Sequence, residues 1–323
     1  MKALCVYSGG LDSMLAAELI RAQGIEVLAL FFETPFFTSE KAAKSARKMG
    51  IFFKVVNITK RHMEIVKHPK HGYGNNMNPC IDCHALMFRI AGEMLRQEGA
   101  DFVFSGEVLG QRPMSQNKRS LSLIARESGL EGLLLRPLSA KKLAPTTPEK
   151  KGWVIRDLLM DFQGRSRKPQ IELANNLNIS EYPSPAGGCL LTDNAFSRRL
   201  KDLLSARHDP ESREIELLKL GRHFRIDTNT KVVAGRNKEE NEALTALAND
   251  KDILLVSMSV PGPTVLVSGD YSNASLKLAA EITVAYSDAK VGENISVRVI
   301  GGAGDRMSVT GVRDKAEFRS YMI

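Results

Sequence analysis

The chain has 323 residues, which at roughly 150 residues per domain is enough for about two domains with full hydrophobic cores. Apolar residues make up 43% and charged residues 25%, a composition that excludes a disordered, collagen-like or small disulfide-rich chain. The net charge of +8 is local: residues 110–168 hold 13 basic and 5 acidic side chains, and the remainder holds 32 of each. Such a block favours a polyanionic partner, although a solvated basic face would have the same composition.

No apolar run approaches the roughly 18 residues that a membrane span requires. The first residues also lack the apolar run and small-residue exit of a cleavable signal. We therefore expect a cytoplasmic protein with no membrane partner. In that compartment the four cysteines are expected to be reduced, metal-binding or catalytic, with Cys5 as a core residue of the first strand.

The first hundred residues alternate between short apolar runs and stretches with helical spacing. This pattern predicts strands at 3–7, 26–32, 52–58 and 101–104, and helices at 11–23, 39–49 and 80–97. Alternating strands and helices indicate βαβ units, and hence an α/β fold with a parallel sheet sandwiched by helices. Ligands of such sheets bind beyond the carboxyl ends of the strands.

The pattern becomes less regular after residue 105. Prolines interrupt short helical stretches over 106–184, which we interpret as a basic elaboration of a first domain spanning 1–195. Residues 196–220 are charged and helical in spacing, typical of a connector. A smaller α+β domain is predicted over 221–323, with strands at 231–234, 253–258, 264–267 and 295–299 and helices at 238–248 and 275–286.

The segment SGGLDS, residues 8–13, lies between the first predicted strand and helix. Its two glycines let the backbone approach a ligand, and the free amides at the helix start can bind an anion. The carboxylate of Asp12 would repel phosphates unless it binds Mg²⁺ or caps the helix. The segment lacks the lysine of a Walker P-loop, so γ-phosphate transfer is not indicated. A glycine-rich turn that only caps the helix is the plain structural alternative.

SGGLDS resembles the SGGxDS signature of the PP-loop ATP pyrophosphatases, which cleave ATP between its α and β phosphates and adenylate a substrate. The resemblance implies an adenine nucleotide alpha hydrolase-like domain that uses ATP and Mg²⁺, with Asp12 as a candidate Mg²⁺ ligand. It also implies that pyrophosphate is bound by Ser8, Gly9, Gly10, Asp12 and Ser13. By position alone, the backbone near Phe31 and Gly106 would contact the nucleoside.

Three further cysteines stand in two motifs. Cys80 and Cys83 begin the third predicted helix in NPCIDCH, with Pro79 suited to the first helical position. Their spacing places both thiols on one helix face, where the positive helix end would lower a thiol pKa. Cys189 follows 106 residues after Cys83 in SPAGGC. The three thiols could hold a [4Fe–4S] cluster with one open iron, a zinc ion completed by His84, or a persulfide relay through Cys83 and Cys189.

In a chain that opens with SGGLDS, NPCxxC and a later GGC resemble the tRNA 2-thiouridine synthetases. The resemblance implies adenylation of a uridine carbonyl in tRNA with pyrophosphate release, then sulfur transfer at Cys80, Cys83 and Cys189. A sulfur donor, either sulfide or a protein persulfide, is implied as well. Some members have Asp where this chain has Cys80, which favours a three-cysteine cluster over a cluster-free persulfide pair. His84 replaces an asparagine of some relatives, and a surface histidine is the simpler interpretation.

Two other functions remain open on these residues. The PP-loop could adenylate a carboxylate for amidation, in which case sulfur chemistry would be absent and Cys189 dispensable. The chain could also be an RNA-binding protein with a vestigial nucleotide site, although the intact SGGLDS disfavours this.

Beside a uridine-activating site, the basic block is expected to bind tRNA phosphates, with Trp153 and Phe162 available for stacking on bases. The candidate cations are Arg112, Lys118, Arg119, Lys141, Lys142, Arg165, Arg167 and Lys168.

Residues 231–267, with KVVAGRNKEENEAL and PGPT, resemble the RNA-binding domain NFACT-R. The resemblance implies a second RNA-contacting module with Gly235, Arg236 and Asn237 as candidates. A turn in which Asn237 caps the following helix is the structural alternative.

Overall fold

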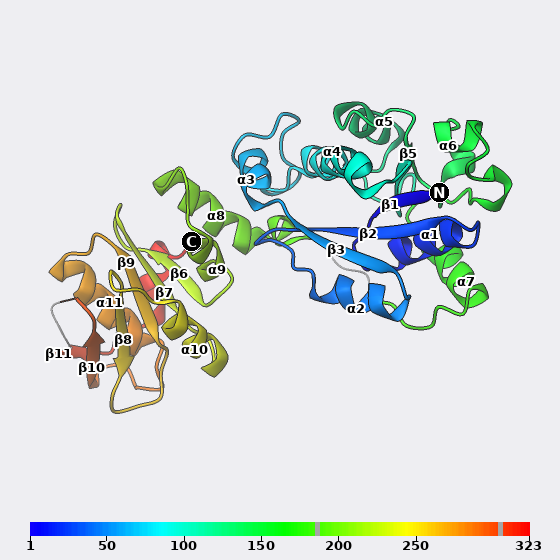
Figure 1. The fold of residues 1–323 in the computed structure, drawn as a ribbon. Helices are drawn as coiled ribbons and strands as arrows, with labels where there is room; N and C mark the ends of the chain where they lie inside the picture. The colour runs from blue at the N-terminus through cyan, green and yellow to red at the C-terminus, as the bar shows by residue number, and fades with distance from the viewer. Residues whose placement is uncertain (185–187, 303–305) are drawn as a thin grey trace. The chain divides into compact units, whose positions relative to one another are not determined.

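The computed structural model describes residues 1–184, 188–302 and 306–323, and the chain divides into two compact units, Met1–Thr192 and Asp193–Ile323. The first unit contains a parallel sheet covered by helices, and the second contains a separate antiparallel sheet (Figure 1). The predicted fold class is confirmed. Both helices of the 196–220 stretch lie in the second unit.

The first unit is built on a five-stranded parallel sheet in the order β3-β2-β1-β4-β5. Its strands are β1 (Lys2–Val6), β2 (Glu26–Glu33), β3 (Phe52–Asn57), β4 (Phe102–Ser105) and β5 (Leu134–Leu135). The central strand β1 is buried on both faces, with Ala3, Leu4 and Cys5 fully inaccessible, which explains why it reads as a continuous apolar run. Cys5 is therefore a core residue, as predicted.

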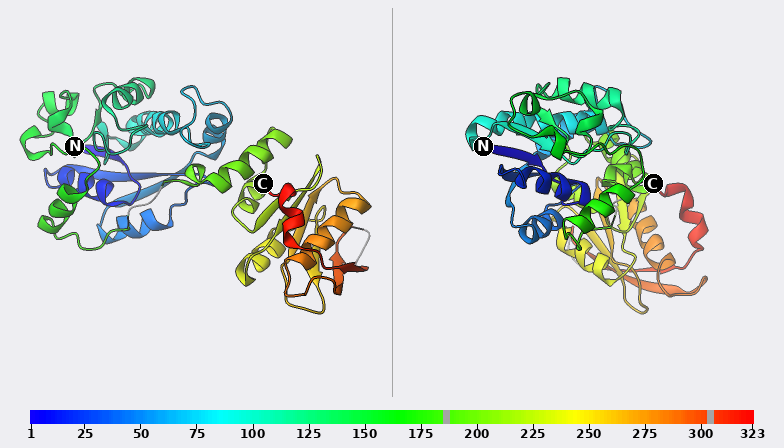
Figure 2. Two further views of the ribbon diagram at one scale, coloured as in Figure 1. Left: turned by 180° about the vertical axis from the view of Figure 1, so that it is seen from behind. Right: turned by 90° about the vertical axis from the view of Figure 1, so that its right-hand side faces the viewer.

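Helices cover both faces of this sheet, as Figures 1 and 2 show from opposite sides. One face carries α1 (Leu11–Arg21), α2 (Glu40–Lys48) and α7 (Lys168–Asn176). The other face carries α3 (Thr59–Lys67), α4 (Cys80–Glu98) and α5 (Lys118–Glu127). Shorter elements are the helix α6 (Thr147–Lys150) and the 3₁₀ helices η1 (Ala140–Lys142), η2 (Arg156–Leu158) and η3 (Leu190–Thr192). The carboxyl ends of β1 and β4 meet at one edge of the sheet.

The stretch 106–184, predicted as an elaboration of the sheet, supplies the edge strand β5, the helix α5 on one face and the helix α7 on the other. Helix α5 begins where the Asn117 side chain accepts a hydrogen bond from the Ser120 amide. The strand escaped sequence analysis because it has two residues, too few to show a period.

The buried histidine of α3 predicts a pH dependence. The His62 side chain is 1% exposed, and neither ring nitrogen has a hydrogen-bond partner among the described residues. It packs against the rings of Phe36 and Phe37, and burial lowers the pKa of His62 to about 4. Because an unfolded histidine binds its proton near pH 6.5, the unfolded chain holds more protons between pH 6.5 and 4, and stability falls as the pH falls through this window.

We expect His62→Leu to reduce the loss of unfolding free energy between pH 7 and pH 5 by about 2 kcal/mol. Urea unfolding followed by the fluorescence of Trp153, the single tryptophan, measures this in the first unit. The same loss in the wild type and in His62→Leu would show that another group is responsible.

The second unit contains a six-stranded antiparallel sheet in the order β11-β10-β8-β9-β7-β6. Its strands are β6 (Arg222–Arg225), β7 (Thr230–Ala234), β8 (Ile253–Ser257), β9 (Val265–Gly269), β10 (Asn294–Ile300) and β11 (Arg306–Gly311). Its helices are α8 (Asn194–Ala206), α9 (Ser212–Leu217), α10 (Lys238–Leu247), α11 (Asn273–Ala285) and the 3₁₀ helix η4 (Lys315–Tyr321). Helix α11 packs on one main core, and α9 and α10 contribute to a smaller one.

Ion pairs attach α8 to this second sheet. Both carboxylate oxygens of Asp202 accept hydrogen bonds from Arg225 of β6, at 3.0 and 2.6 Å, and Lys231 of β7 lies 3.5 Å away.

In the GRN segment, the Asn237 side chain caps α10 by accepting from the Glu240 amide, and Arg236 pairs with Glu240. These contacts give Arg236 and Asn237 the local structural roles that the sequence left as an alternative. No helix in the described part of the chain is long and apolar enough to cross a membrane.

Candidate functional site

The SGGLDS segment forms the turn from β1 into α1. Gly9 has a φ of +75°, and a Cβ there would lie 2.5 Å from the Cα of Ala42 in α2, so both conformation and space require glycine. Gly10 is the N-cap residue and provides no side-chain acceptor for the first amides of α1. Ser13 Oγ donates to the Gly10 carbonyl at 2.8 Å. The first turn of α1 therefore has the form of an anion site.

The turn after β4 packs directly on this helix start. A Cβ at Gly106 would lie 2.5 Å from both the carbonyl carbon and oxygen of Asp12, so no side chain fits. Phe31 of β2 is 7% exposed and makes an edge contact with Phe37. The structure thus brings Gly106 against the SGGLDS turn, at the sheet edge where the sequence predicts the nucleotide.

Asp12 does not cap α1; its carboxylate joins a buried polar network. Gln111 Nε2 donates to Asp12 Oδ2 at 2.7 Å, and Gln170 Nε2 donates to Gln111 Oε1 at 2.9 Å. Burial raises the pKa of Asp12, whereas the Gln111 hydrogen bond and the charges of Arg167 and Arg112 act to lower it. Asp12 Oδ1 and Arg167 Nε are both buried without a partner among the described residues. These two atoms are available to groups that the structure does not contain.

Arg112 and Arg167 were predicted from the sequence only as tRNA contacts. Their charges act on Asp12 inside the candidate phosphate site, a placement that sequence reasoning missed. No motif links them to SGGLDS, because Arg167 lies 155 residues from Asp12 and reaches it only through the packing of α7 on α1.

The three candidate cysteines lie in the first unit. Pro79 is the N-cap of α4, not its first helical residue, and Cys80 begins the helix. Burial, followed by the charges of Cys189 and Cys80, raises the pKa of Cys83; burial also raises the pKa of Cys189, and the charge of Cys80 adds to it. The expectation that the helix end would lower the thiol pKa was wrong for Cys83, because desolvation outweighs the helix end. The mutual effects place the three thiols within electrostatic reach of one another.

Asn76 connects the two cysteine segments, and Asn78 contacts the first cysteine. Asn76 Nδ2 donates to the Thr192 carbonyl at 2.7 Å, and the Thr192 amide and hydroxyl donate to the Cys189 carbonyl at 2.9 and 2.7 Å. Asn78 Nδ2 donates to Cys80 Sγ at 3.3 Å. Sequence reasoning missed both asparagines, although NNMNPC places them directly before the first cysteine.

His84 is held by a buried ion-pair chain. Its Nδ1 lies 2.8 Å from Glu107 Oε1, and Glu107 Oε2 accepts from Arg136 Nε at 2.8 Å. Burial acts to raise the pKa of Glu107, but Arg136 and His84 outweigh it and lower that pKa to about 2. Within residues 1–184, 188–302 and 306–323, no three His, Cys, Asp or Glu side chains are arranged to hold a single metal ion. The zinc alternative completed by His84 therefore gains no support from the geometry.

The cations of the basic block have different surroundings. Seven of the eight candidates are exposed, and Arg167 is half-buried; the exposed ones are Arg112, Lys118, Arg119, Lys141, Lys142, Arg165 and Lys168. Lys141 donates to the Asp157 carbonyl, and Lys142 lies 3.8 Å from Asp161. Trp153 and Phe162 pack against the core of the first unit, Trp153 on Phe102, so the expectation that both are free for stacking was wrong.

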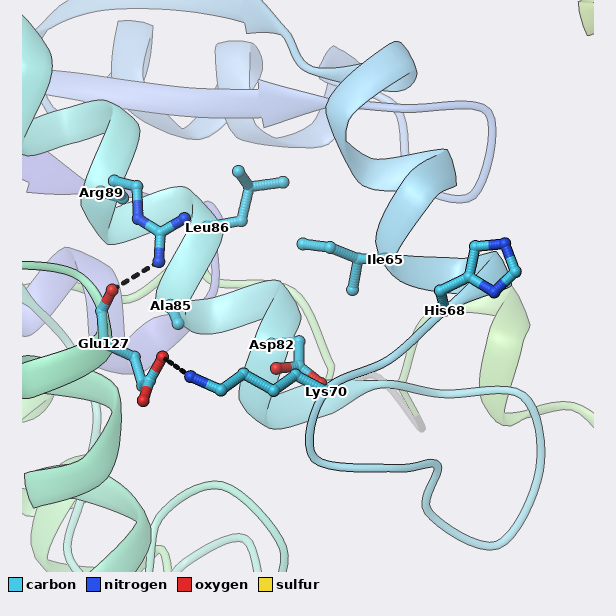
Figure 3. A pocket seen from close by; sticks show the side chains of 8 residues that line it. All are labelled: Ile65, His68, Lys70, Asp82, Ala85, Leu86, Arg89 and Glu127. Carbon is cyan, nitrogen blue, oxygen red and sulfur yellow. Dashed lines mark hydrogen bonds and ion pairs between the residues drawn. The ribbon is translucent and has the colours of Figure 1, made fainter.

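A cavity of about 150 Å³ lies between α3, α4 and α5 (Figure 3). Its lining consists of Ile65, His68, Lys70, Asp82, Ala85, Leu86, Arg89 and Glu127. Lys70 pairs with the Glu127 carboxylate at 2.7 Å, and Arg89 donates to the Glu127 carbonyl at 2.6 Å. The Asp82 carboxylate accepts a hydrogen bond from the His71 amide at 2.9 Å, and its other oxygen lies 2.6 Å from Nδ1 of the His71 ring. Much of the charge lining this cavity is therefore already compensated within the protein.

Two family models match the chain. Residues 1–142 match the family described as thiamine biosynthesis protein (ThiI), and residues 221–322 match the NFACT protein RNA-binding domain. A probable tRNA sulfurtransferase of Oceanobacillus iheyensis is 32% identical over 42% of this chain and 34% of the relative. A tRNA-specific 2-thiouridylase of Fusobacterium nucleatum is 32% identical over 32% of this chain and 33% of the relative. The chain spans about a third of the length of these curated relatives.

Among solved structures, a 4-thiouridine synthetase in complex with RNA and ATP is 22% identical over 55% of this chain and 51% of that chain, with a TM-score of 0.34. A predicted subunit of tRNA methyltransferase from Methanocaldococcus jannaschii is 19% identical over 42% of this chain and 69% of that chain, with a TM-score of 0.32. Residues 1–142 are thus similar to the ThiI family, and residues 221–322 are similar to the NFACT RNA-binding domain.

Proposed function

We propose that this protein is an ATP-dependent tRNA uridine thiolase. The observation that carries the proposal is the presence, in one compact unit, of an intact SGGLDS turn at the sheet edge and of three cysteines from two segments 106 residues apart, where the charge of Cys80 acts to raise the pKa of both Cys83 and Cys189. The ThiI match over 1–142 and the sulfurtransferase names of the relatives support the reaction type. The NFACT match supports RNA as the partner.

The chemistry proceeds in two steps. A uridine carbonyl oxygen attacks the α-phosphorus of ATP, the bond from that phosphorus to the bridging oxygen breaks, and pyrophosphate leaves. A soft sulfur nucleophile then attacks the activated ring carbon, and AMP departs with the former carbonyl oxygen. The amides of residues 11–13 face the developing pyrophosphate charge. Asp12 Oδ1, buried without a partner among the described residues, fits a ligand of the Mg²⁺ that accompanies ATP, which would supply Lewis-acid stabilisation.

Sulfur transfer is assigned to Cys80, Cys83 and Cys189. Three thiols with no fourth cysteine nearby suit a [4Fe–4S] cluster, in which each thiolate binds a different iron, so the absence of a single-ion arrangement does not count against it. A bound cluster would supply an open iron position for sulfide. A protein persulfide is the other donor we consider, and we place the reaction in the cytoplasm.

Anaerobic purification with iron and sulfide assays, followed by mass spectrometry of nucleosides from bulk tRNA incubated with ATP and sulfide, tests the proposal. We expect a thiolated uridine and release of pyrophosphate that depends on tRNA. A cluster-loaded protein that yields no thiolated uridine would overturn the thiolase proposal. Pyrophosphate release with a carboxylate acceptor would favour amidation, and the absence of release with any RNA would favour a vestigial nucleotide site.

Arg167 yields a separate prediction, because its Nε has no partner among the described residues and its charge acts on Asp12, which supports a role in phosphate binding. We expect Arg167→Gln to weaken ATP binding by about tenfold or more, the loss typical of a hydrogen bond to a charged group. Arg165→Gln removes an exposed cation two residues away and serves as the matched control. Titration calorimetry with ATP gives the dissociation constants. Unchanged ATP affinity together with weaker tRNA binding would return Arg167 to the RNA surface predicted from the sequence.

A further inference from the structure

The helix α2 presents a row of cations outside the basic block. Lys41, Lys44 and Lys48 follow one another at spacings of three and four residues, and Arg47 lies beside them, whereas the buried face consists of small residues. Glu40 is the single acid, so nine residues have a net charge of +3. The excess of basic residues in 110–168 did not point to this surface, because α2 lies outside that stretch.

These charges are not neutralised as others on the first unit are. Lys54, Arg61 and Lys70 each pair with a glutamate. On α2 only Lys48 does so, with Glu181; Lys41, Lys44 and Arg47 are exposed and form no ion pair with any residue that the structure describes. Like charges three and four residues apart destabilise a helix, so a partner of opposite charge would relieve this repulsion.

The position of α2 links this surface to the candidate site. Gly9 of the SGGLDS turn lies against Ala42, and Tyr7 and Ser45 share a buried hydrogen bond of 2.7 Å. The other end of α2 leads through a turn to β3, the edge strand of the sheet, next to which α2 lies in Figure 1. Phe52, the first residue of β3, is 72% exposed, but it pairs in register with Leu28, which packs on the face of the sheet opposite to α2. Its ring therefore does not belong to the surface that the cations of α2 form.

We propose that Lys41, Lys44 and Arg47 form an RNA-binding surface that guides the tRNA backbone along α2 toward the SGGLDS turn. This inference rests on the proposed function for the identity of the RNA. A second copy of the chain is disfavoured, because pairing through β3 would set two α2 helices of like charge side by side. A polyanion instead meets the cations with opposite charge and releases counterions.

The test compares Lys41→Gln/Lys44→Gln with the control Lys60→Gln/Arg96→Gln, which removes two other exposed cations of the same unit. Fluorescence anisotropy with labelled bulk tRNA, over a series of salt concentrations, gives the dissociation constants without ATP or sulfur. We expect the α2 variant to lower the slope of log affinity against log salt by between about 1 and 2, and the control to leave it unchanged. Equal slopes for wild type and the α2 variant would overturn the proposal.

Phe52→Ser is a second control, since it removes an exposed ring on the opposite face of the sheet without altering charge. We expect it to leave the affinity for tRNA unchanged. Sedimentation of the wild type tests the alternative occupant, a second copy of the chain that pairs through β3. A dimer abolished by Phe52→Ser would overturn the RNA assignment in favour of that second copy. Wild-type tRNA binding without thiolation would refute the proposed function and leave this surface standing, so the two failures are distinguishable.

Discussion

Cys189→Ser is expected to lower the rate of uridine thiolation by about 10³-fold or more, the order of loss that follows removal of a reacting nucleophile. Serine replaces a soft sulfur by a hard oxygen that neither carries a persulfide nor binds iron well. ATP binding should be unchanged, because the nucleotide contacts predicted here come from the SGGLDS turn and not from the Cys189 segment. Mass spectrometry of tRNA nucleosides, with calorimetry of ATP binding, measures the two properties separately.

Cys5→Ala is the matched control, since Cys5 is fully buried in β1 and belongs to the core. We expect it to retain thiolation. If the protein contains a [4Fe–4S] cluster, Cys189→Ser should also lower its iron and sulfide content. If sulfur instead passes through a persulfide, neither the wild type nor Cys189→Ser should contain iron. Full thiolation by Cys189→Ser would refute sulfur transfer at this cysteine.

The sequence predicted those features that repeat or that depend on local chain conformation. The strand–helix alternation of residues 3–104 is periodic, and the parallel sheet follows from it. The SGGLDS turn was predictable because position 9 has a left-handed backbone conformation, with a φ of +75°, which favours glycine. Strand β5 was missed because two residues show no period. Helix α3 was missed although it is as long as α2, because no glycine follows its last residue in the way that Gly50 follows α2.

The candidate site was predictable only in part, for a related physical reason. Residue types and short spacings identify thiols and an anion turn, but long-range packing decides what surrounds them. The pKa of Cys83 depends on desolvation by neighbours distant in sequence, so a rule about helix ends gave the wrong direction. Arg167 belonged by composition to an RNA surface, and only the packing of α7 on α1 places its charge near Asp12.

Glu107→Gln is expected to lower the free energy of unfolding by about 3–5 kcal/mol, because it leaves the guanidinium of Arg136 buried without a compensating charge. The Arg136 side chain is 7% exposed, and its Nε donates to Glu107 at 2.8 Å. Glu98→Gln is the matched control, since Glu98 pairs with the more exposed Lys54 and should cost about 1 kcal/mol or less. Urea unfolding followed by Trp153 fluorescence gives both values.

The pH dependence of this pair has a defined sign. The pKa of Glu107 is lowered from 4.5 to about 2 in the folded protein, so its stabilisation is complete above pH 4.5 and is lost as the pH falls toward 2. Glu107→Gln should lack this acid loss. Replacing both partners, in Glu107→Gln/Arg136→Met, should recover much of the stability, because an apolar side chain of similar volume needs no counter-charge. No recovery in the double variant would refute the charge explanation.

The functional consequence of Glu107 follows from its neighbours. Glu107 directly follows Gly106, whose backbone contacts Asp12, and it holds His84, the residue after Cys83. One buried carboxylate thus joins the turn beside the candidate phosphate site to the helix that carries two of the three thiols. Under conditions where Glu107→Gln remains folded, we therefore expect ATP affinity and thiolation to fall together. A loss of stability with both activities intact would confine this ion-pair chain to the fold.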